Sequence, residues 1–530
     1  MRGLKSHIDR TDWQFGARNE DDDFHTDVVF LRVSTDQIRQ TAGIAHRTAL
    51  LRYRGYTGEF YYPLADTREI CTHLIDRLLR EEKWAMELNS SIRKASDDLA
   101  RVFAPWGPSP DFSLAPLKSL LALYQRQLKA QISLYKVAWI AEILQAEDVG
   151  LTTYLYRYLG SRLGNEEKTQ AAFFALTASK SPSVFRLEAT GILDLAKRIV
   201  RNRELKNVFS RPLKELRLAL PHDIRQRIEK LAGTYGFFGY HGYGTRQKAN
   251  ADSYLLRVQE LVLSPEKLST LDAHLSGLDA AVLDARKLAR ELKIDREHRR
   301  LFRVYSDFAP TKAARRLAQL TNFFYLDKLL AEFARRLEVP ESWLRFMTPE
   351  EIVLAGRTRK FPANAQARTQ AMLYVRWESK EYVTTAPWIR TLRLPGPEGT
   401  RKGESTTVLR GLCASPGHAI GRARIVRRGD DRELDGIDAQ TILVSIEADP
   451  DLVEAISRAG AVVTDQGGIT CHVAVIAREL NTPCVTGTRV ATATIRSGDL
   501  VEVDANAGIV KILERAPNDP DAGKSSPRGR

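Results

Sequence analysis

The first four hundred positions of the chain follow a helical pattern. Apolar residues recur there every three to four positions, and this period predicts amphipathic helices. The predicted helical segments include Leu74–Leu79, Leu117–Tyr135, Lys267–Leu292 and Ala313–Leu337. Ser113 lies just ahead of the second segment and Pro116 in its opening turn, which suits a helix start. Only Val28–Val33 and Leu51–Tyr62 look extended, and strands and helices do not alternate as a barrel or a doubly wound sheet requires.

The pattern changes near Leu394. The segment Leu394–Thr407 (LPGPEGTRKGESTT) has no apolar period and reads as a linker. Beyond it, short helices are predicted at Pro450–Ala459 and Thr470–Leu480, and Asn506–Gly508 suits a hairpin turn. Strands are predicted at Gly421–Val426, Thr441–Ser445, Ala461–Thr464, Pro483–Gly487, Leu500–Asp504 and Gly508–Ile512.

These patterns divide the 530 residues, which are too many for one hydrophobic core. We expect a multidomain protein of the α and α/β classes. Residues 1–393 form a large, mainly helical region, and 394–407 a flexible linker. Residues 408–514 form a compact α/β domain, and the polar tail 515–530 is expected to be disordered.

Charge is unevenly spread over these parts. The net charge is +14, but residues 408–514 contain 11 basic and 15 acidic residues, and the tail carries +2. Residues 1–407 therefore carry +16. Such a surface attracts anions, whether phosphorylated substrates, nucleic acid or an acidic protein, although solvated arginine-rich helix faces give the same excess. Nucleic acid is disfavoured as a partner because no helix combines clustered Lys and Arg with interleaved aromatic residues.

The composition is that of an ordinary globular protein, with 43% hydrophobic and 28% charged residues. The most apolar stretch, Leu134–Leu144, is interrupted by Lys136 and Glu142, so no membrane span is expected. The start of the chain has no apolar core of a secretory signal. The four cysteines form no CxxC pair or disulfide framework. We therefore expect a cytoplasmic protein without a metal site.

One segment carries recognisable chemistry, Thr464–Leu480 (TDQGGITCHVAVIAREL). A predicted strand ends at Thr464, Gly467 and Gly468 follow, and a helix begins with His472 in its first turn. The amides and the dipole at a helix start favour a phosphoryl group, glycines allow close approach, and a neutral imidazole is a nucleophile. An ordinary histidine at a helix start is the alternative that this spacing alone leaves open.

A longer match supports the chemical interpretation. The run TDQGGITCHVAVIARELNTPCVTGT resembles the phosphohistidine signature of the phosphoenolpyruvate-utilising enzymes. GLCASPGHAIGRARIV (Gly411–Val426), EADPDLVEAISRAGAVVTD (Glu447–Asp465) and SGDLVEVDANAGIVKIL resemble the remainder of their mobile domain, in the same order. The resemblance implies a swivelling β/β/α domain in which His472 carries the phosphoryl group. It also implies that Gly467, Gly468 and Thr470 surround that group, with Cys471 as a neighbour rather than a nucleophile.

Complete enzymes of that family also contain an ATP-grasp domain that loads the histidine, and the first 400 residues lack the strand-rich pattern of such a domain. We therefore expect a separate ATP-grasp protein as partner, with Mg²⁺ and ATP bound at the partner's site and no cofactor on this chain alone. The expected function is phosphotransferase component of a split enzyme. The alternatives are direct loading of His472 from phosphoenolpyruvate, and a regulatory protein that phosphorylation of His472 switches.

The acceptor is expected to be a small molecule bound by the helical region. That region loosely resembles the acceptor domain of rifampin phosphotransferase-like proteins. In this chain, TYGFFGYHGYGTRQ (Thr234–Gln247) stands where such proteins have a glycine-rich loop. The resemblance suggests acceptor binding by Tyr240, His241, Tyr243 and Arg246, with His241 as a general base. A tight inter-helix loop with packed aromatic residues is the alternative reading.

Overall fold

The computed structural model separates the chain into two compact units, Met1–Pro397 and Glu398–Arg530. The residues that it describes are 2–19, 23–146, 148–179, 181–240, 248–396, 407–426, 436–446, 453–468 and 471–517. The division between the units falls within the segment predicted as a linker. Of that segment, Leu394 packs on the core of the first unit, and the Thr407 carbonyl accepts a hydrogen bond from the Ile512 amide of the second, at 2.8 Å.

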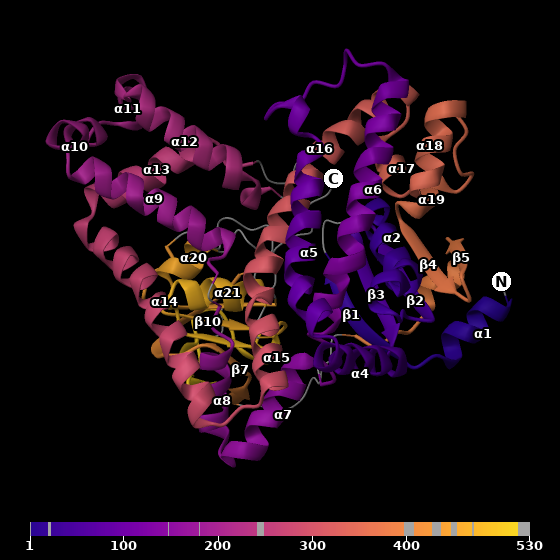
Figure 1. Ribbon diagram of the computed structural model, residues 1–530. Helices are drawn as coiled ribbons and strands as arrows, with labels where there is room; N and C mark the ends of the chain where they lie inside the picture. Colours follow the sequence, from indigo (N-terminus) through magenta and orange to yellow (C-terminus); the bar gives the residue numbers. More distant parts are fainter. Residues whose placement is uncertain are drawn as a thin grey trace. The chain divides into compact units, whose positions relative to one another are not determined.

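The N-terminal unit is built mainly from helices (Figure 1). Its first α-helices are α1 (Arg2–Arg10), α2 (Phe24–Arg32), α3 (Arg39–Ala42), α4 (Leu64–Arg80), α5 (Glu82–Arg101), α6 (Leu117–Ile143), α7 (Leu151–Leu163), α8 (Glu166–Leu176), α9 (Val184–Val200) and α10 (Arg203–Phe209). The others are α11 (Leu213–Ala219), α12 (His222–Tyr235), α13 (Ala251–Leu263), α14 (Pro265–Glu291), α15 (Arg296–Ser306), α16 (Phe308–Leu337), α17 (Glu341–Arg345), α18 (Pro349–Thr358) and α19 (Ala365–Arg368). A π-helix, η1 (Val33–Gln37), follows α2, and the 3₁₀ turns are η2 (Ala104–Trp106), η3 (Gly236–Gly239) and η4 (Pro387–Thr391).

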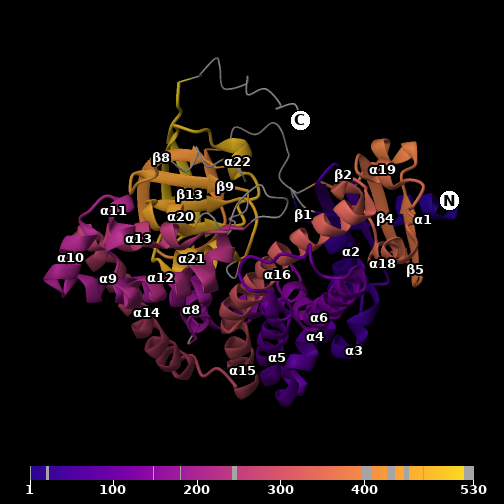
Figure 2. The same ribbon diagram turned by 90° about the horizontal axis from the view of Figure 1, so that it is seen from above.

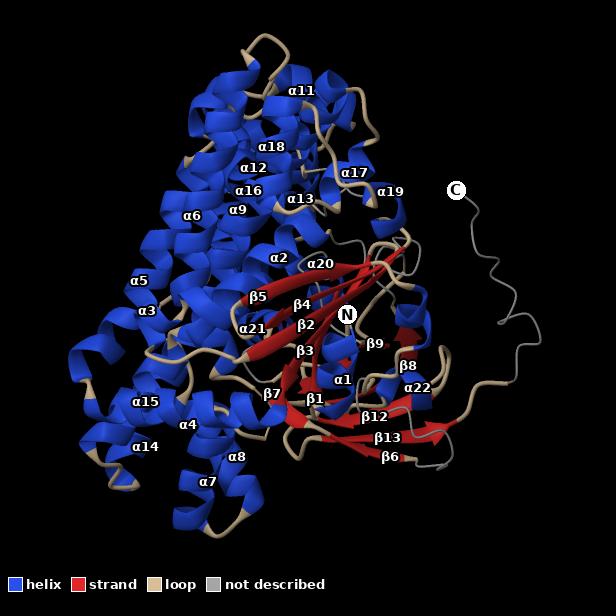
Figure 3. Ribbon diagram, turned by 90° about the vertical axis from the view of Figure 1, so that its right-hand side faces the viewer, coloured by secondary structure: helices blue, strands red, loops and turns tan. Residues whose placement is uncertain are grey.

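The same unit contains an antiparallel sheet with the strand order β1-β3-β2-β4-β5 (Figure 3). Its strands are β1 (Trp13–Asn19), β2 (Thr48–Arg54), β3 (Thr57–Pro63), β4 (Ala371–Trp377) and β5 (Lys380–Thr384). The extended stretch predicted at Leu51–Tyr62 is therefore confirmed as the hairpin of β2 and β3. One face of the sheet packs on α1 and η4 through Leu50, Leu373 and Val375. The other meets α2, where Phe24 contacts Tyr53 and Tyr374.

The strand predicted at Val28–Val33 is wrong, because these residues belong to α2 and the start of η1. The Asp23 side chain accepts a hydrogen bond of 2.8 Å from the Thr26 amide and so caps the helix. Most of α2 is buried, and residues 28–31 (VVFL) form a continuous apolar run in it. Periodicity alone does not distinguish such a short apolar run from a buried strand.

Three long helices, α5, α6 and α16, form the centre of the helical part. Arg93 of α5 donates a hydrogen bond to Thr311 at 2.9 Å, and Phe103 stacks on Tyr325 with ring centroids 5.1 Å apart. These contacts join α5, and the residues that directly follow it, to α16. The predicted helices at Leu117–Tyr135, Lys267–Leu292 and Ala313–Leu337 are confirmed within α6, α14 and α16. Ser113 does not cap α6, whose N-cap is Pro116.

The C-terminal unit contains a mixed sheet with the strand order β6-β13-β12-β8-β9-β10-β11-β7. Figure 2 shows it from above with its helices. Its strands are β6 (Val408–Arg410), β7 (Leu412–Ser415), β8 (His418–Ile425), β9 (Thr441–Ser445), β10 (Ala461–Thr464), β11 (Cys484–Thr486), β12 (Leu500–Asp504) and β13 (Ile509–Glu514). The helices are α20 (Val453–Arg458), α21 (His472–Glu479) and α22 (Ala491–Thr494). All six predicted strands are present, while β6, β7 and α22 were not predicted.

Side chains alternate across this sheet. β10 and β11 are buried on both faces, whereas β12 and β13 bury one face. Val463 on β10, Val444 on β9 and Ile495 beside α22 share one core with the β12–β13 hairpin. Val462 and Cys484 are also buried, and the α21 residues Val473 and Ile476 are 1% exposed. Tail residues 518–530 lie outside the described part of the chain. Among the described residues, no helix combines the length and apolarity needed to cross a membrane.

Candidate functional site

The predicted phosphoryl site lies where β10 ends and α21 begins. β10 is fully buried and runs parallel to both neighbours, β9 and β11. Its last residue, Thr464, leads into Asp465 and Gln466, whose amides donate to the Ser445 and Ile446 carbonyls at 3.1 and 2.9 Å. The turn therefore starts from the carboxyl end of a central parallel strand, where ligands of α/β sheets commonly bind.

The two glycines of the turn lie in different surroundings. Gly467 has φ = +101°, and a Cβ atom there would lie 2.7 Å from Cys471 Sγ. Both the backbone angle and the close contact require glycine at this position. A Cβ at Gly468 would have no atom within 4 Å among the described neighbours. Gly467 thus closes the turn, whereas no described atom fills the space beside Gly468.

Cys471 is the N-cap of α21 and is half-buried. Its amide donates to the Gly468 carbonyl at 2.9 Å, and its own carbonyl accepts from the Val475 amide at 3.0 Å. The thiol makes no capping hydrogen bond to the first turn of the helix. Cysteine here takes the usual place of Ser, Thr, Asp or Asn, and amides of a first helical turn are groups that can bind an anion.

His472 is the first residue of α21. The structure describes its backbone, which starts the helix directly after the cap, and does not describe its side chain. Thr470 lies outside the described residues. The structure thus brings Gly467, Gly468, Cys471 and the backbone of His472 into one turn, and their functional roles stay predictions.

Asp465 is a residue of this site to which the sequence analysis gave no role. It is 8% exposed and accepts hydrogen bonds from the Thr492 hydroxyl and from the Thr492 amide, the latter at 3.0 Å. Its carbonyl accepts from the Arg489 amide at 2.9 Å. Burial raises the pKa of its carboxyl, against the lowering effect of these donors. Asp465 therefore links the start of the turn to α22. Its position next to the two glycines is a sequence feature that could have identified it as part of the site.

Arg478 lies near the end of α21, and its Nε donates to the Ala414 carbonyl of β7 at 3.3 Å. Ser415 of the same strand donates its hydroxyl to the Ala477 carbonyl, also at 3.3 Å. These bonds fix the C-terminal end of the helix to the edge of the sheet. They orient α21 so that its first turn stays at the end of β10.

The predicted acceptor loop is described only at its start. Tyr240 is 6% exposed and donates its hydroxyl to the Asp327 carboxylate. Burial, together with that carboxylate, raises the pKa of Tyr240. The preceding Phe237 packs on Phe324. These contacts agree with an inter-helix loop whose aromatic residues are packed in the core. His241, Tyr243 and Arg246 lie outside the described residues, so acceptor binding by this loop stays a prediction.

Similarity to known proteins concentrates on the C-terminal unit. Residues 437–508 match the family described as "PEP-utilising enzyme, mobile domain". The resemblance drawn from the signature is thereby confirmed for this part of the chain. The proposed likeness of the helical region to rifampin phosphotransferase-like proteins stays a prediction.

Several proteins named phosphoenolpyruvate synthase align with the chain. The probable enzyme of Methanothermobacter thermautotrophicus is 43% identical over 113 residues, which are 21% of this chain and 16% of that protein. The enzyme of Pyrococcus furiosus is 40% identical over 139 residues, which are 26% of this chain and 17% of that protein. This chain therefore spans less than a fifth of these relatives, and the similarity supports the domain rather than their complete activity.

Two further matches have other names. The chondramide synthase cmdD of Chondromyces crocatus is 41% identical over 103 residues, 19% of this chain and 3% of that protein. The holo-form structure of aconitase X from Thermococcus kodakaraensis is 24% identical, with coverage of 20% of this chain and 98% of that chain. Its TM-score of 0.17 is too low to support a structural argument.

Proposed function

We propose that this chain is the phosphoryl-carrying component of a split phosphotransferase. The observation that carries the proposal is the position of His472. It is the first residue of a helix that follows the Gly467–Gly468 turn at the end of a parallel strand. The sequence there matches a PEP-utilising mobile domain.

The chemistry of this turn fits a phosphohistidine intermediate. A neutral imidazole nitrogen of His472 would attack phosphorus, forming a P–N bond while a P–O bond to the donor breaks. The amides at the start of α21 would stabilise the phosphoryl oxygens. In the second half-reaction an acceptor hydroxyl would form a P–O bond as the P–N bond breaks. The imidazole regains its electron pair, and the hydroxyl proton passes to the imidazole or to solvent.

The donor in this proposal is ATP, bound with Mg²⁺ by a separate ATP-grasp protein. The fold of the N-terminal unit supports the need for a partner. Among the described residues its sheet is a five-stranded antiparallel one packed on helices, whereas an ATP-grasp domain is expected to be rich in strands. The acceptor would be a small molecule bound by the N-terminal unit. The predicted linker, residues 394–407, would tether the mobile domain near its acceptor.

Phosphoenolpyruvate is a second candidate donor. Several matching relatives are named phosphoenolpyruvate synthase, and the histidine signature lies within the residues that match the PEP-utilising mobile domain. In that case His472 would exchange its phosphoryl group with phosphoenolpyruvate without the ATP-grasp partner.

Intact-mass spectrometry of the purified chain tests these proposals. The chain is incubated with Mg-ATP, with phosphoenolpyruvate, and with Mg-ATP plus a candidate ATP-grasp protein. We expect a gain of one phosphoryl group, ~80 Da and labile to acid, only when the ATP-grasp protein is present. Gain with phosphoenolpyruvate alone would establish the second donor instead.

The matched control is His418→Ala, because His418 lies in the same unit, is exposed and pairs with Glu502 at 3.0 Å on strand β12. His472→Ala should abolish the mass gain, and His418→Ala should leave it intact. Phosphorylation that survives in His472→Ala would contradict the assignment of the carrier residue. An unmodified chain beside an ATP-grasp protein that is itself active on ATP would favour a regulatory role.

A further inference from the structure

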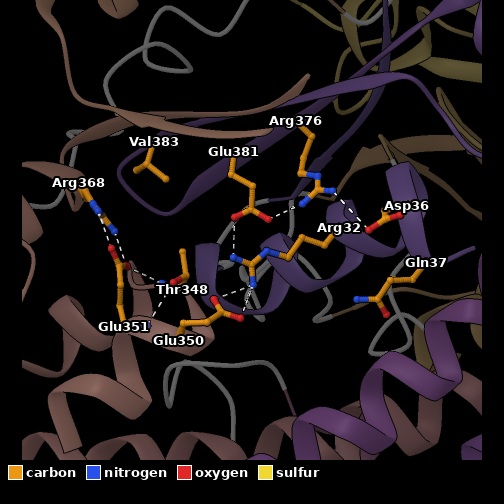
Figure 4. A pocket seen from close by; sticks show the side chains of 10 residues that line it. All are labelled: Arg32, Asp36, Gln37, Thr348, Glu350, Glu351, Arg368, Arg376, Glu381 and Val383. Carbon is orange, nitrogen blue, oxygen red and sulfur yellow. Dashed lines mark hydrogen bonds and ion pairs between the residues drawn. The ribbon is translucent and has the colours of Figure 1, made fainter. Parts of the chain in front are cut away.

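A polar pocket of about 710 Å³ opens beside the sheet of the N-terminal unit. Figure 4 shows residues from the end of α2, from η1, from the region of α18 and α19, and from strands β4 and β5 around it. Three arginines and four carboxylates line it, and Val383 is the aliphatic residue among the described lining. A lining this rich in charge favours a hydrophilic ligand over a flat aromatic one.

The arginines of the pocket are already paired. Arg32 donates from Nη1 to both oxygens of Glu350 at 2.9 Å and from Nη2 to Glu381 at 2.7 Å. Arg376 donates to the other oxygen of Glu381 and lies 3.8 Å from Asp36. As Figure 4 shows, Glu381 thereby bridges the two guanidinium groups. An anionic ligand would have to displace one of these carboxylates.

The accessible charges of the pocket are negative. The side chains of Glu350 and Asp36 are 68% and 61% exposed, whereas those of Arg32 and Arg376 are 17% and 9% exposed. The described lining as a whole carries one more carboxylate than guanidinium groups. A positively charged group near Asp36 or Glu350 would therefore be attracted by the exposed carboxylate without displacing an arginine.

The π-helix η1 supplies two of the lining residues, Asp36 and Gln37. Its wider turn is closed by the Ile38 amide, which donates to the Val33 carbonyl at 3.0 Å. π-helical turns are rare and often occur at functional sites. In Figure 4 the Gln37 amide is not bonded to the other residues drawn, so it offers a donor and an acceptor beside Asp36.

We infer that this pocket binds a small, hydroxyl-rich molecule that carries a positive charge, such as an amino sugar. Hydroxyl groups both donate and accept, so they match a surface on which carboxylates and guanidinium groups alternate. The ammonium group matches the exposed carboxylates of Asp36 and Glu350. On the basis of the proposed function, the phosphoryl acceptor would belong to the same class, as a hydroxyl-rich molecule with a positive charge.

The charge of the pocket also suits product release. Phosphorylation of one hydroxyl adds about −1.5 to −2 charges to the ligand near neutral pH. The phosphorylated molecule would then meet the exposed carboxylates with a net negative charge. We expect it to bind more weakly than the unphosphorylated acceptor, which allows turnover.

Three ligands that share one ring skeleton test the inference: glucosamine, glucose and glucose 6-phosphate, which are cationic, neutral and anionic. Each is titrated into the full-length chain and followed by isothermal titration calorimetry. We expect glucosamine to bind about tenfold more tightly than glucose, and glucose 6-phosphate more weakly than both. Raising the ionic strength should reduce the advantage of glucosamine.

The variants Glu350→Gln and Asp36→Asn, combined in one chain, should remove most of the advantage of glucosamine over glucose. The matched control is Glu82→Gln, because Glu82 also accepts two hydrogen bonds from one arginine, Arg296 at 3.0 and 3.1 Å, on another surface. It should leave binding unchanged. Preference for glucose 6-phosphate, no binding of glucosamine by the folded chain, or an equal effect of the control would overturn the inference.

The same titration with His472→Ala separates this inference from the proposed function. Binding of glucosamine does not require the phosphoryl carrier, so it should persist in that variant. If it persists while wild-type His472 never becomes phosphorylated, the pocket stands and the phosphotransferase proposal fails. If His472 is phosphorylated but glucosamine does not bind, the phosphotransferase proposal stands without this acceptor class.

Discussion

Two clusters in the N-terminal unit pair an arginine with carboxylates, one in the buried interior and the other at the wall of a pocket. In the sealed cluster, Arg345 is 3% exposed and pairs with Asp327 at 2.7 Å, with Asp23 at 3.2 Å and with Glu341. In the open cluster, Arg32 pairs with Glu350 and Glu381 at the wall of a pocket. The sealed cluster joins α2, α16 and α17, whereas the open one leaves carboxylates available to a ligand. The clusters differ most in their most exposed carboxylate, which is Glu350 at 68% in the open cluster and Glu341 at 38% in the sealed one. The other two carboxylates of the sealed cluster, Asp23 and Asp327, are 6% and 13% exposed.

The largest expected effect is the loss of the sealed arginine. Arg345→Met leaves the buried carboxylates Asp23 and Asp327 without their shared cation, and we expect a loss of ~3–5 kcal/mol in the free energy of unfolding. Arg335→Met is the matched control, since Arg335 pairs with Glu332 at the surface at 2.8 Å. It should lose far less, because a pair with a solvent-exposed guanidinium contributes little to stability.

Urea unfolding followed by tryptophan fluorescence measures this difference. All seven tryptophans lie between Trp13 and Trp388, so the signal reports on the N-terminal unit alone. Equal losses in Arg345→Met and Arg335→Met would show that the sealed cluster is no more important to stability than a surface pair.

The two clusters should also respond to pH in opposite directions. Burial raises the pKa of Asp327 despite the adjacent Arg345. Burial also acts to raise the pKa of Glu381, but hydrogen bonds and charges from Arg32 and Arg376 outweigh it and lower that pKa. An acid whose pKa is raised in the folded state lowers the free energy of unfolding as the pH rises above its pKa in the unfolded state. An acid whose pKa is lowered in the folded state raises the free energy of unfolding as the pH rises towards its pKa in the unfolded state.

Unfolding free energies of Asp327→Asn, Glu381→Gln and wild type across pH ~3.5 to 7 check these signs. The advantage of wild type over Asp327→Asn should shrink as pH rises from ~4, the ordinary aspartate range. Its advantage over Glu381→Gln should be full above ~4.5 and shrink on acidification below it. Parallel profiles for the two variants would contradict the assigned directions.

The two units also differ in what their sequence could predict. In the C-terminal unit each strand is short and bounded by turns, so local patterns identified strands such as β9 and β10 at their exact bounds. The site there lies in one continuous segment, so its glycines and His472 could be read together. The hydrogen bonds that hold Asp465 come from Thr492, 27 positions away, and no local pattern predicts such a contact.

The open cluster was not predicted because its residues are distant in the sequence. Arg32 and Glu350 are 318 positions apart, and β4 pairs with β2 across a similar separation. One local signal was present: Arg376 shares a strand face with Met372 and Tyr374, which are fully buried. An arginine on such a face must have a partner, but the partner's identity follows only from the fold.

The smallest expected effect is on the exposed carboxylate of the open cluster. Glu350→Gln breaks the pair with Arg32, yet Glu350 is 68% exposed and Arg32 keeps its bond to Glu381. We expect the free energy of unfolding to change by less than ~0.5 kcal/mol, and by less still at high salt. Glu82→Gln, which breaks a bidentate pair whose carboxylate is 53% exposed, should also give a small change in the fluorescence assay. A loss above ~1 kcal/mol in Glu350→Gln alone would assign the open cluster a structural role like that of Arg345. A negligible loss of stability, together with weaker glucosamine binding in the combined Glu350→Gln and Asp36→Asn variant, would instead separate ligand binding from folding.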